Sequence, residues 1–131
     1  MKLFLSITTL LLFIACKNNV EIETPLQDIC KDKISASSKN GYTKNYYDNS
    51  SKIESVGHYQ NGIPQGFWKY FYRNEKVRAE GHYNKGKKQG FWKEYYKNGN
   101  VKSEGHIIQC EPSGYWKFYD KKGNVIREMN Y

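Results

Sequence analysis

Three histidines recur at a constant step of 24 residues, a regularity that first suggests a metal site. They are His58, His82 and His106. If the repeating unit is a β-hairpin, equivalent side chains of successive units lie two strand spacings apart, about 9.5 Å. A zinc ion holds its nitrogen ligands at about 2.0–2.1 Å, so histidines spaced in this way cannot share one ion. We therefore expect no metal site and no cofactor.

Three glutamates, Glu80, Glu104 and Glu128, follow the same step. Each is predicted to face a lysine across a strand pair, so their recurrence has a structural cause rather than a role in acid–base catalysis. Nucleophilic catalysis needs a base within hydrogen-bond reach and a third group that orients the base. Nothing in the sequence places a single Ser or Cys beside a unique His. We expect no catalytic residues and no enzymatic activity.

Cys16 closes an apolar segment at the N-terminus. Residues 3–14 follow Lys2 and form a run of 12 residues, which fits the core of a signal peptide and falls short of the ~20 residues that cross a bilayer. The ending Phe13-Ile14-Ala15-Cys16 resembles the lipobox of bacterial lipoproteins, with Phe13 in place of the usual Leu. The resemblance implies that residues 1–15 are removed, that Cys16 is lipidated, and that the protein is held at the cell envelope, at the outer membrane. The alternative is an ordinary secretory signal with a coincidental cysteine.

Lipidation of Cys16 would leave Cys30 and Cys110 as an even pair. Exported proteins enter an oxidising compartment, so a disulfide between the two is one expectation, and two thiols are the alternative. Residues 16–40 are polar and show no sustained hydrophobic period, so we interpret them as a tether.

The aromatic residues locate the folded part of the chain. The chain has 131 residues, enough for one domain, and a formal net charge of +8. All twelve Tyr and all three Trp lie after Gly41, whereas all six Leu lie at or before Leu26. This distribution argues against a helical bundle, a transmembrane protein and a large enzyme, and it favours a core of aromatic rings.

Self-similarity then predicts the architecture. A repeat domain spans residues 41–131, with a degenerate unit at 41–65 and units at 66–89, 90–113 and 114–131. Each unit contains two strands, and Asn98-Gly99 predicts a two-residue type I′ turn between them. The fold class is therefore all-β, an antiparallel meander of about four β-hairpins that forms a short solenoid sheet with a 24-residue repeat. The repeated structural positions include Trp68, Trp92, Trp116, Gly81 and Gly105.

The predicted turn fixes a register. Trp92 should face Gly105, which would leave room for the indole ring. Lys93 should face Glu104, and Tyr96 should face Val101. The same register places His82 opposite Phe67 and His106 opposite Phe91, which favours a ring-packing role for the histidines. In the outer units, Lys44 takes the place of the tryptophan, and Met129 takes the place of the glycine facing Trp116, as in capping repeats.

The sequence of residues 90–105, GFWKEYYKNGNVKSEG, resembles the bacterial MORN repeat variant. The pattern is Gly-x-Trp-x-x-(Tyr)-Tyr-x-x-Gly-x-Val-x-x-Glu-Gly, and it extends over about residues 41–131. The resemblance implies a scaffold that binds proteins or lipids, and many bacterial members carry an antitoxin label. An export signal departs from the picture of a soluble antitoxin.

Basic residues suggest a partner. Lys85, Lys87 and Lys88 share one inter-repeat loop, and Lys121 and Lys122 occupy the last hairpin tip. These residues would suit an anionic lipid or envelope polysaccharide, whereas export argues against nucleic acid as the partner. The alternative is a solvated surface.

The two faces of the sheet differ in their rings. Trp68 and Tyr70 share one face and Phe67 takes the other, so the sheet must coil to cover its rings or present one face to a partner. We predict a non-catalytic, lipid-anchored envelope protein that binds or scaffolds a protein or anionic envelope partner. The alternative is an antitoxin or immunity-type protein that neutralises a toxin. The oligomeric state stays open.

Overall fold

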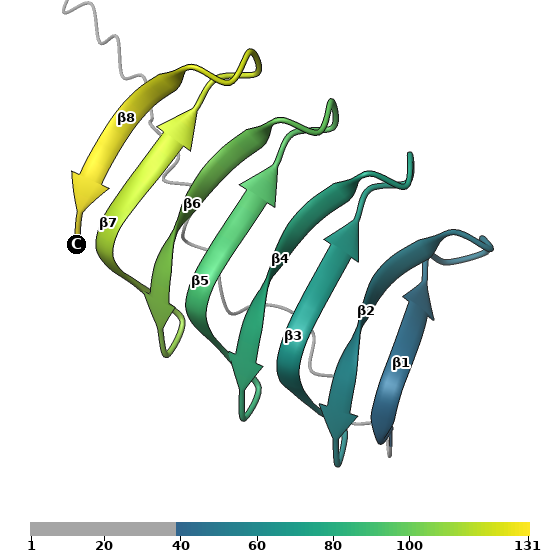
Figure 1. Ribbon diagram of the computed structural model, residues 1–131. Helices are drawn as coiled ribbons and strands as arrows, with labels where there is room; N and C mark the ends of the chain where they lie inside the picture. Colours follow the sequence, from purple (N-terminus) through teal and green to yellow (C-terminus); the bar gives the residue numbers. More distant parts are fainter. Residues whose placement is uncertain (1–38) are drawn as a thin grey trace, which may run out of the picture.

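The computed structural model describes residues 39–131. They form one antiparallel sheet in which every strand pairs with its neighbours in the sequence (Figure 1). The strands are β1 (Gly41–Tyr46), β2 (Ile53–Gln60), β3 (Ile63–Phe71), β4 (Val77–Asn84), β5 (Lys87–Tyr95), β6 (Val101–Ile108), β7 (Glu111–Tyr119) and β8 (Val125–Asn130). The predicted all-β meander of four hairpins is confirmed. The expected signal peptide and nearly all of the expected tether lie outside the described residues.

Two kinds of turn lie at the two ends of the strands. Short inter-repeat turns join β2 to β3, β4 to β5 and β6 to β7 at one end, and longer hairpin tips lie at the other end (Figure 1). Each inter-repeat turn holds two consecutive residues with positive φ, the requirement of a type I′ turn. They are Asn61-Gly62, Lys85-Gly86 and Gln109-Cys110.

The prediction of a two-residue turn at Asn98-Gly99 is wrong. Gly99 has a φ of 99°, but Asn98 is not among the residues with positive φ. The Gly99 amide donates to the Tyr96 carbonyl at 2.9 Å, and the Tyr96 amide donates to the Asn100 carbonyl at 2.8 Å. These bonds enclose a three-residue loop with one left-handed residue at its end, which is the next most common hairpin connection.

This loop also changes the pairing beside it. A β-bulge between Glu94 and Tyr95 makes Tyr95, rather than Tyr96, the partner of Val101. Beyond the bulge the predicted register is confirmed, because Trp92 pairs with Gly105 and Lys93 pairs with Glu104.

The first hairpin corrects a second expectation. Its tip holds six residues, 47–52, between the paired Tyr46 and Ile53, whereas the next tip holds five, 72–76. The extra residue shifts β1 by one position, so that Thr43 pairs with Gly57 and Lys44 pairs with Val56. Thr43, rather than Lys44, therefore takes the place of the tryptophan.

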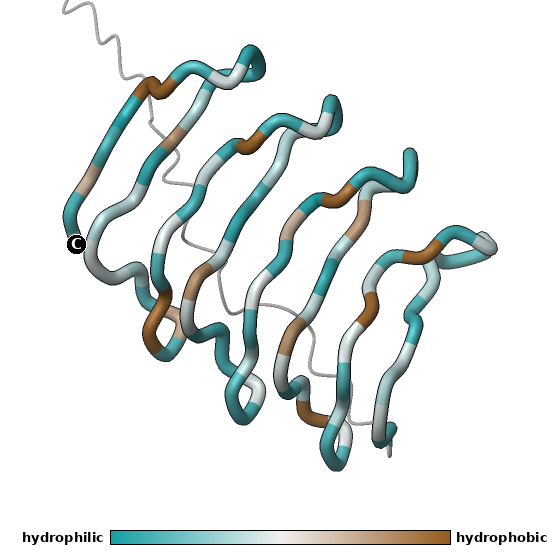
Figure 2. Tube along the Cα trace, in the orientation of Figure 1, coloured by the Kyte–Doolittle hydropathy of each residue, from teal (hydrophilic) through white to brown (hydrophobic). Residues whose placement is uncertain are grey.

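One face of the sheet carries the core. The three tryptophans are only 2–3% exposed, and Tyr83, Ile107 and Phe118 are buried with them. Figure 2 shows that strongly hydrophobic residues are few and recur near the start of the return strands, so aromatic rings must supply most of the buried area. Within residues 39–131 no helix has the length and hydropathy needed to cross a membrane.

Candidate ligand-binding surface

Each indole lies across a glycine of the preceding hairpin. A Cβ atom added to Gly81 would come within 2.3 Å of the Trp92 ring, and one added to Gly105 would come equally close to the Trp116 ring. We predicted that Gly105 leaves room for Trp92, its partner in the strand pairing. The need for glycine is correct, but the indole that requires it belongs to the next hairpin.

A hydrogen bond explains the direction in which each ring leans. The Trp92 indole N–H donates to the backbone carbonyl of His82 at 3.1 Å. Trp68 makes the equivalent bond to His58 at 3.2 Å, and Trp116 makes it to His106 at 2.9 Å. Because these carbonyls belong to the preceding return strand, the ring turns toward that strand and covers its glycine.

The last strand ends this series. Met129 of β8 pairs with Trp116 and occupies the repeat position of Gly105. Tyr131 lies beyond it, with its ring centroid 6.4 Å from that of Trp116. A side chain at position 129 leaves no bare backbone for a further indole to cover, which agrees with the capping role predicted for this unit.

Lysine and glutamate alternate on the opposite face of the sheet. From β3 to β8, the pairing places Lys69, Glu80, Lys93, Glu104, Lys117 and Glu128 side by side. The predicted pairs within hairpins form ion pairs, with N–O distances of 3.2 Å for Lys69 and Glu80 and 3.0 Å for Lys93 and Glu104. In the third predicted pair, Lys117 and Glu128, the N–O distance is 4.0 Å.

Tyrosine hydroxyls hold two of these glutamates in place. Tyr95 donates to Glu80 at 2.6 Å, and Tyr119 donates to Glu104 at 2.5 Å. The bond from Tyr119 is the largest influence on the Glu104 pKa and lowers it, while the same bond raises the pKa of Tyr119 to about 12. Burial is the largest influence on the Glu80 pKa and raises it, but the bonds from Tyr95 and Lys69 outweigh burial and leave that pKa lowered.

Sequence reasoning missed these tyrosine–glutamate bonds, although the repeats contain a signal for them. In the preceding unit, the positions of Tyr95 and Glu80 are taken by Phe71 and Val56. Hydroxyl and carboxylate are thus both present or both absent, as expected for two partners.

A row of exposed rings runs beside the charged row. We call it the outer ring row: Tyr42, His58, Phe67, His82, Phe91, His106 and Tyr115. The predicted contacts are confirmed, with centroids 5.2 Å apart for Phe67 and His82 and 5.4 Å apart for Phe91 and His106. The four Phe and Tyr rings are 44–59% exposed. The rings therefore cross seven consecutive strands on the face opposite the tryptophans, where they remain accessible.

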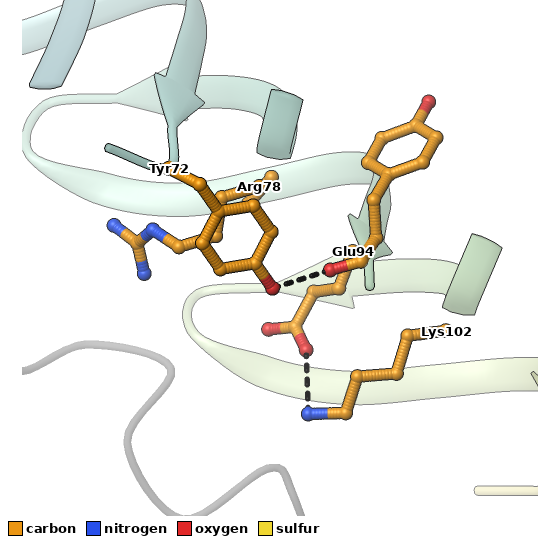
Figure 3. A pocket seen from close by; sticks show the side chains of 6 residues that line it. Tyr72, Arg78, Glu94 and Lys102 are labelled. Atoms are coloured by element: carbon orange, nitrogen blue, oxygen red, sulfur yellow. Dashed lines mark hydrogen bonds and ion pairs between the residues drawn. The ribbon is translucent and has the colours of Figure 1, made fainter. Parts of the chain in front are cut away.

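An open pocket of about 220 Å³ lies near the hairpin tips (Figure 3). Tyr72, Arg78, Glu94 and Lys102 line it, and the Tyr72 hydroxyl donates to the Tyr95 carbonyl at 2.6 Å. Burial is the largest influence on the Tyr72 pKa and raises it. Among the lining residues, Glu94 and Lys102 form an ion pair with an N–O distance of 3.7 Å. In the next unit, Phe118 takes the place of Glu94.

The predicted basic residues fall into two separate places. Lys85 lies in an inter-repeat turn, and Lys87 and Lys88 begin β5 directly after that turn. Lys121 and Lys122 lie at the last hairpin tip, at the opposite end of the strands (Figure 1). The structure does not bring the two groups together. The Lys88 ammonium lies 4.7 Å from the centroid of the Trp92 ring, so this lysine also packs against the core face.

Cys110 occupies a position that favours glycine. Its φ is 74°, and the equivalent turn residues are Gly62 and Gly86. Its sulfur is in a disulfide. Cys16 and Cys30 both lie outside the described residues, so the pairing with Cys30 and the lipidation of Cys16 stay predictions. In the described part of the chain, no cluster of three or more His, Cys, Asp or Glu side chains is placed to hold a metal ion.

Comparison with known proteins agrees with this geometry. The MORN repeat variant family matches the chain three times, over residues 64–85, 88–109 and 112–131. Residues 64–131 are three variant MORN repeats. Each matched MORN segment holds one outgoing strand, one hairpin tip and one return strand. The β1–β2 hairpin lies before the first match but continues the same sheet. A search of curated proteins finds no match to this chain.

MORN repeats generally serve as modules that bind proteins or membranes. In this chain, the MORN tryptophan and glycine build the packed face. The outer ring row and the charged row repeat with the same period on the other face. These two rows are the candidate binding surface.

Proposed function

We propose that this protein is a non-catalytic, lipid-anchored binding module of the bacterial cell envelope, and that the outer ring row contacts its partner. The observation that carries the proposal is the exposure of the Phe and Tyr rings in that row. Phe67 and Phe91 are 47% and 44% exposed, although each belongs to a repeat whose other face is well packed. Exposed apolar and aromatic side chains gathered on one face of a protein are typical of surfaces that bind a partner.

The N-terminal sequence supports the location. The lipobox-like ending at Cys16 and the polar residues 16–40 fit a domain held near the outer membrane by a lipid and a tether. Lys85 and Lys87, at the inter-repeat turn between β4 and β5, provide positive charge that would be attracted to an anionic membrane or envelope polymer.

An antitoxin or immunity-type role is the alternative. Aromatic side chains contribute strongly to protein–protein interfaces, so the outer ring row also suits a toxin as its partner. Under this alternative the protein should restore growth to cells that produce a toxin encoded beside it. A binding module for an envelope component should have no such effect.

Fractionation tests the proposal. A Cys16→Ser chain isolates the contribution of the sheet, because it removes the lipid. This chain should still sediment with purified envelopes, and the additional changes Phe67→Ala and Phe91→Ala should reduce the sedimented fraction. Ile108→Ala and Ile126→Ala form the matched control, because these side chains are exposed but lie outside the outer ring row. Equal sedimentation of the two double variants would contradict the proposal.

A further inference from the structure

We propose that the outer ring row binds an extended, uncharged, β-linked polysaccharide, with one disaccharide of the ligand per repeat. The inference rests on the proposed function, since it names the ligand class for the same surface. It follows from the spacing of the rings, from the polar groups beside them and from the balance of charge.

The spacing fits a ligand with a two-sugar period. Phe67, Phe91 and Tyr115 lie on every second strand, so they repeat at about 9.5 Å, which is close to the length of a β-1,4-linked disaccharide. The flat face of a sugar ring presents C–H groups that pack on aromatic rings. His82 and His106 lie on the intervening strands and pair with Phe67 and Phe91, so each of these hairpins presents a pair of rings to the sugar.

The charged row supplies hydrogen-bond partners along the same line. Lys69 lies two residues from Phe67 on β3, and Glu80 lies two residues from His82 on β4, a separation of about 6.6 Å along each strand. Ammonium groups donate and carboxylates accept, so together they match hydroxyl groups, which do both. The ion pairs and the tyrosine hydroxyls hold these side chains in fixed positions.

Polar side chains lie between the ring pairs of successive hairpins. Gln65 pairs with His58 and Gln89 pairs with His82. A carbohydrate lying along the outer ring row would thus meet a pair of rings on each hairpin and an amide between hairpins.

The balance of charge separates this ligand from polyanions. From Lys69 to Glu128 the charged row contains three lysines and three glutamates in strict alternation, so it carries no net charge. A nucleic acid or an anionic membrane laid on this face would meet a carboxylate at every second strand. An uncharged ligand meets no such repulsion.

The regularity of the surface also favours a polymer over a folded protein. Phe, His, Lys and Glu recur with the same spacing and the same contacts in the units of Phe67 and Phe91. A polysaccharide offers the same chemical group at each repeat, whereas the surface of a globular protein does not.

Calorimetric titration of the full chain carrying Cys16→Ser tests the inference. The probes are β-1,4-linked glucose and N-acetylglucosamine oligomers of two to six sugars, with α-linked maltohexaose as the control ligand. Affinity for one β-linked series should rise with each added disaccharide, and maltohexaose should not bind. Phe91→Ala should weaken the binding of the hexamer about three- to tenfold, the equivalent of losing one ring contact. Ile126→Ala should bind as the parent does, and both variants should melt near the parent temperature.

Three results would overturn the inference: no binding of either β-linked hexamer at millimolar concentration, equal binding of maltohexaose, or no effect of Phe91→Ala. If envelope sedimentation still depends on Phe67 and Phe91 while no oligosaccharide binds, the inference about the ligand fails and the proposed function stands. If sedimentation is also independent of these rings, the proposed function fails together with the inference.

Discussion

The Trp92 indole covers Gly81 of the preceding hairpin so closely that a Cβ atom at position 81 would lie 2.3 Å from the ring. The same relationship joins Trp68 to Gly57 and Trp116 to Gly105. Each contact links one hairpin to the next, so the tryptophans hold the repeats together as well as filling the core.

Gly81→Ala should therefore lower the free energy of unfolding by about 1–3 kcal/mol, the usual cost of overpacking. Urea denaturation followed by tryptophan fluorescence measures the change. His82→Ala is the matched control, because the His82 side chain is exposed and only its backbone carbonyl accepts the indole bond. Gly62 is not a suitable control, because its φ of 77° would strain any other residue. If Gly81→Ala and His82→Ala unfold alike, the packing of Trp92 on Gly81 has been misjudged.

The Tyr119–Glu104 hydrogen bond predicts a loss of stability at alkaline pH. The pKa of Tyr119 is raised from about 10 in an unfolded chain to about 12 in the folded protein. A raised pKa contributes stability that is complete below pH ~10 and is lost as the pH rises through the folded pKa. Tyr119→Phe should flatten the decline of melting temperature over this range. Glu104→Gln should also flatten it, because the carboxylate causes the shift. A Tyr119→Phe variant with the parent slope would argue against the bond.

Cys110 should show effects of opposite sign in the two redox states. Without its disulfide, Cys110→Gly should be more stable than the parent by about 1 kcal/mol, because glycine removes the strain of a positive φ. Under oxidising conditions the same variant should be less stable, because it lacks the bridge. If the partner is Cys30, the bridge closes 110 − 30 = 80 residues, and the chain-entropy model gives up to about 4.5 kcal/mol.

Melting temperatures with and without reductant measure both effects. Cys110→Ala separates them, because it removes the sulfur and keeps the strained Cβ. Two reactive thiols in the denatured, oxidised mature protein would refute the bridge between Cys30 and Cys110.

The basic inter-repeat turn that carries Lys85 and Lys87 should bind anionic vesicles in a salt-dependent way. Lys85→Gln with Lys87→Gln should weaken binding, and the parent interaction should fade as the Debye length falls from ~10 Å at 0.1 M salt to ~3 Å at 1 M. Lys88 is left unchanged because it packs against Trp92. The matched control is Lys121→Gln with Lys122→Gln, at the hairpin tip on the opposite end of the strands. If vesicle binding does not change with salt concentration, the prediction is wrong and these lysines contribute to solubility alone.

The register of the hairpins could be predicted because the repeat and the Lys–Glu pairs agree on one alignment. Lys93 opposite Glu104 and Phe91 opposite His106 follow from that alignment. The turn could not be assigned in the same way. Asn-Gly occurs both at 61–62, where two residues have positive φ, and at 98–99, where only Gly99 does.

The direction of each indole and the exposure of each ring also escaped prediction. The pairing names the residue opposite Trp92, but the bond to the His82 carbonyl decides which neighbouring strand the ring covers. Alternation along a strand separates Phe67 from Trp68. It does not tell which of the two faces remains open, since that depends on how the whole sheet packs.

The histidines provide the most direct test of the outer ring row, because all three histidines of the chain belong to it. Proton NMR of the Cys16→Ser chain resolves their ring signals, and soluble material from purified envelopes can be added stepwise. We predict that the signals of His58, His82 and His106 shift or broaden together, while the indole N–H signals of the three buried tryptophans change little. Histidine signals that stay unchanged while the chain demonstrably binds the envelope material would contradict the assignment of this row as the binding surface.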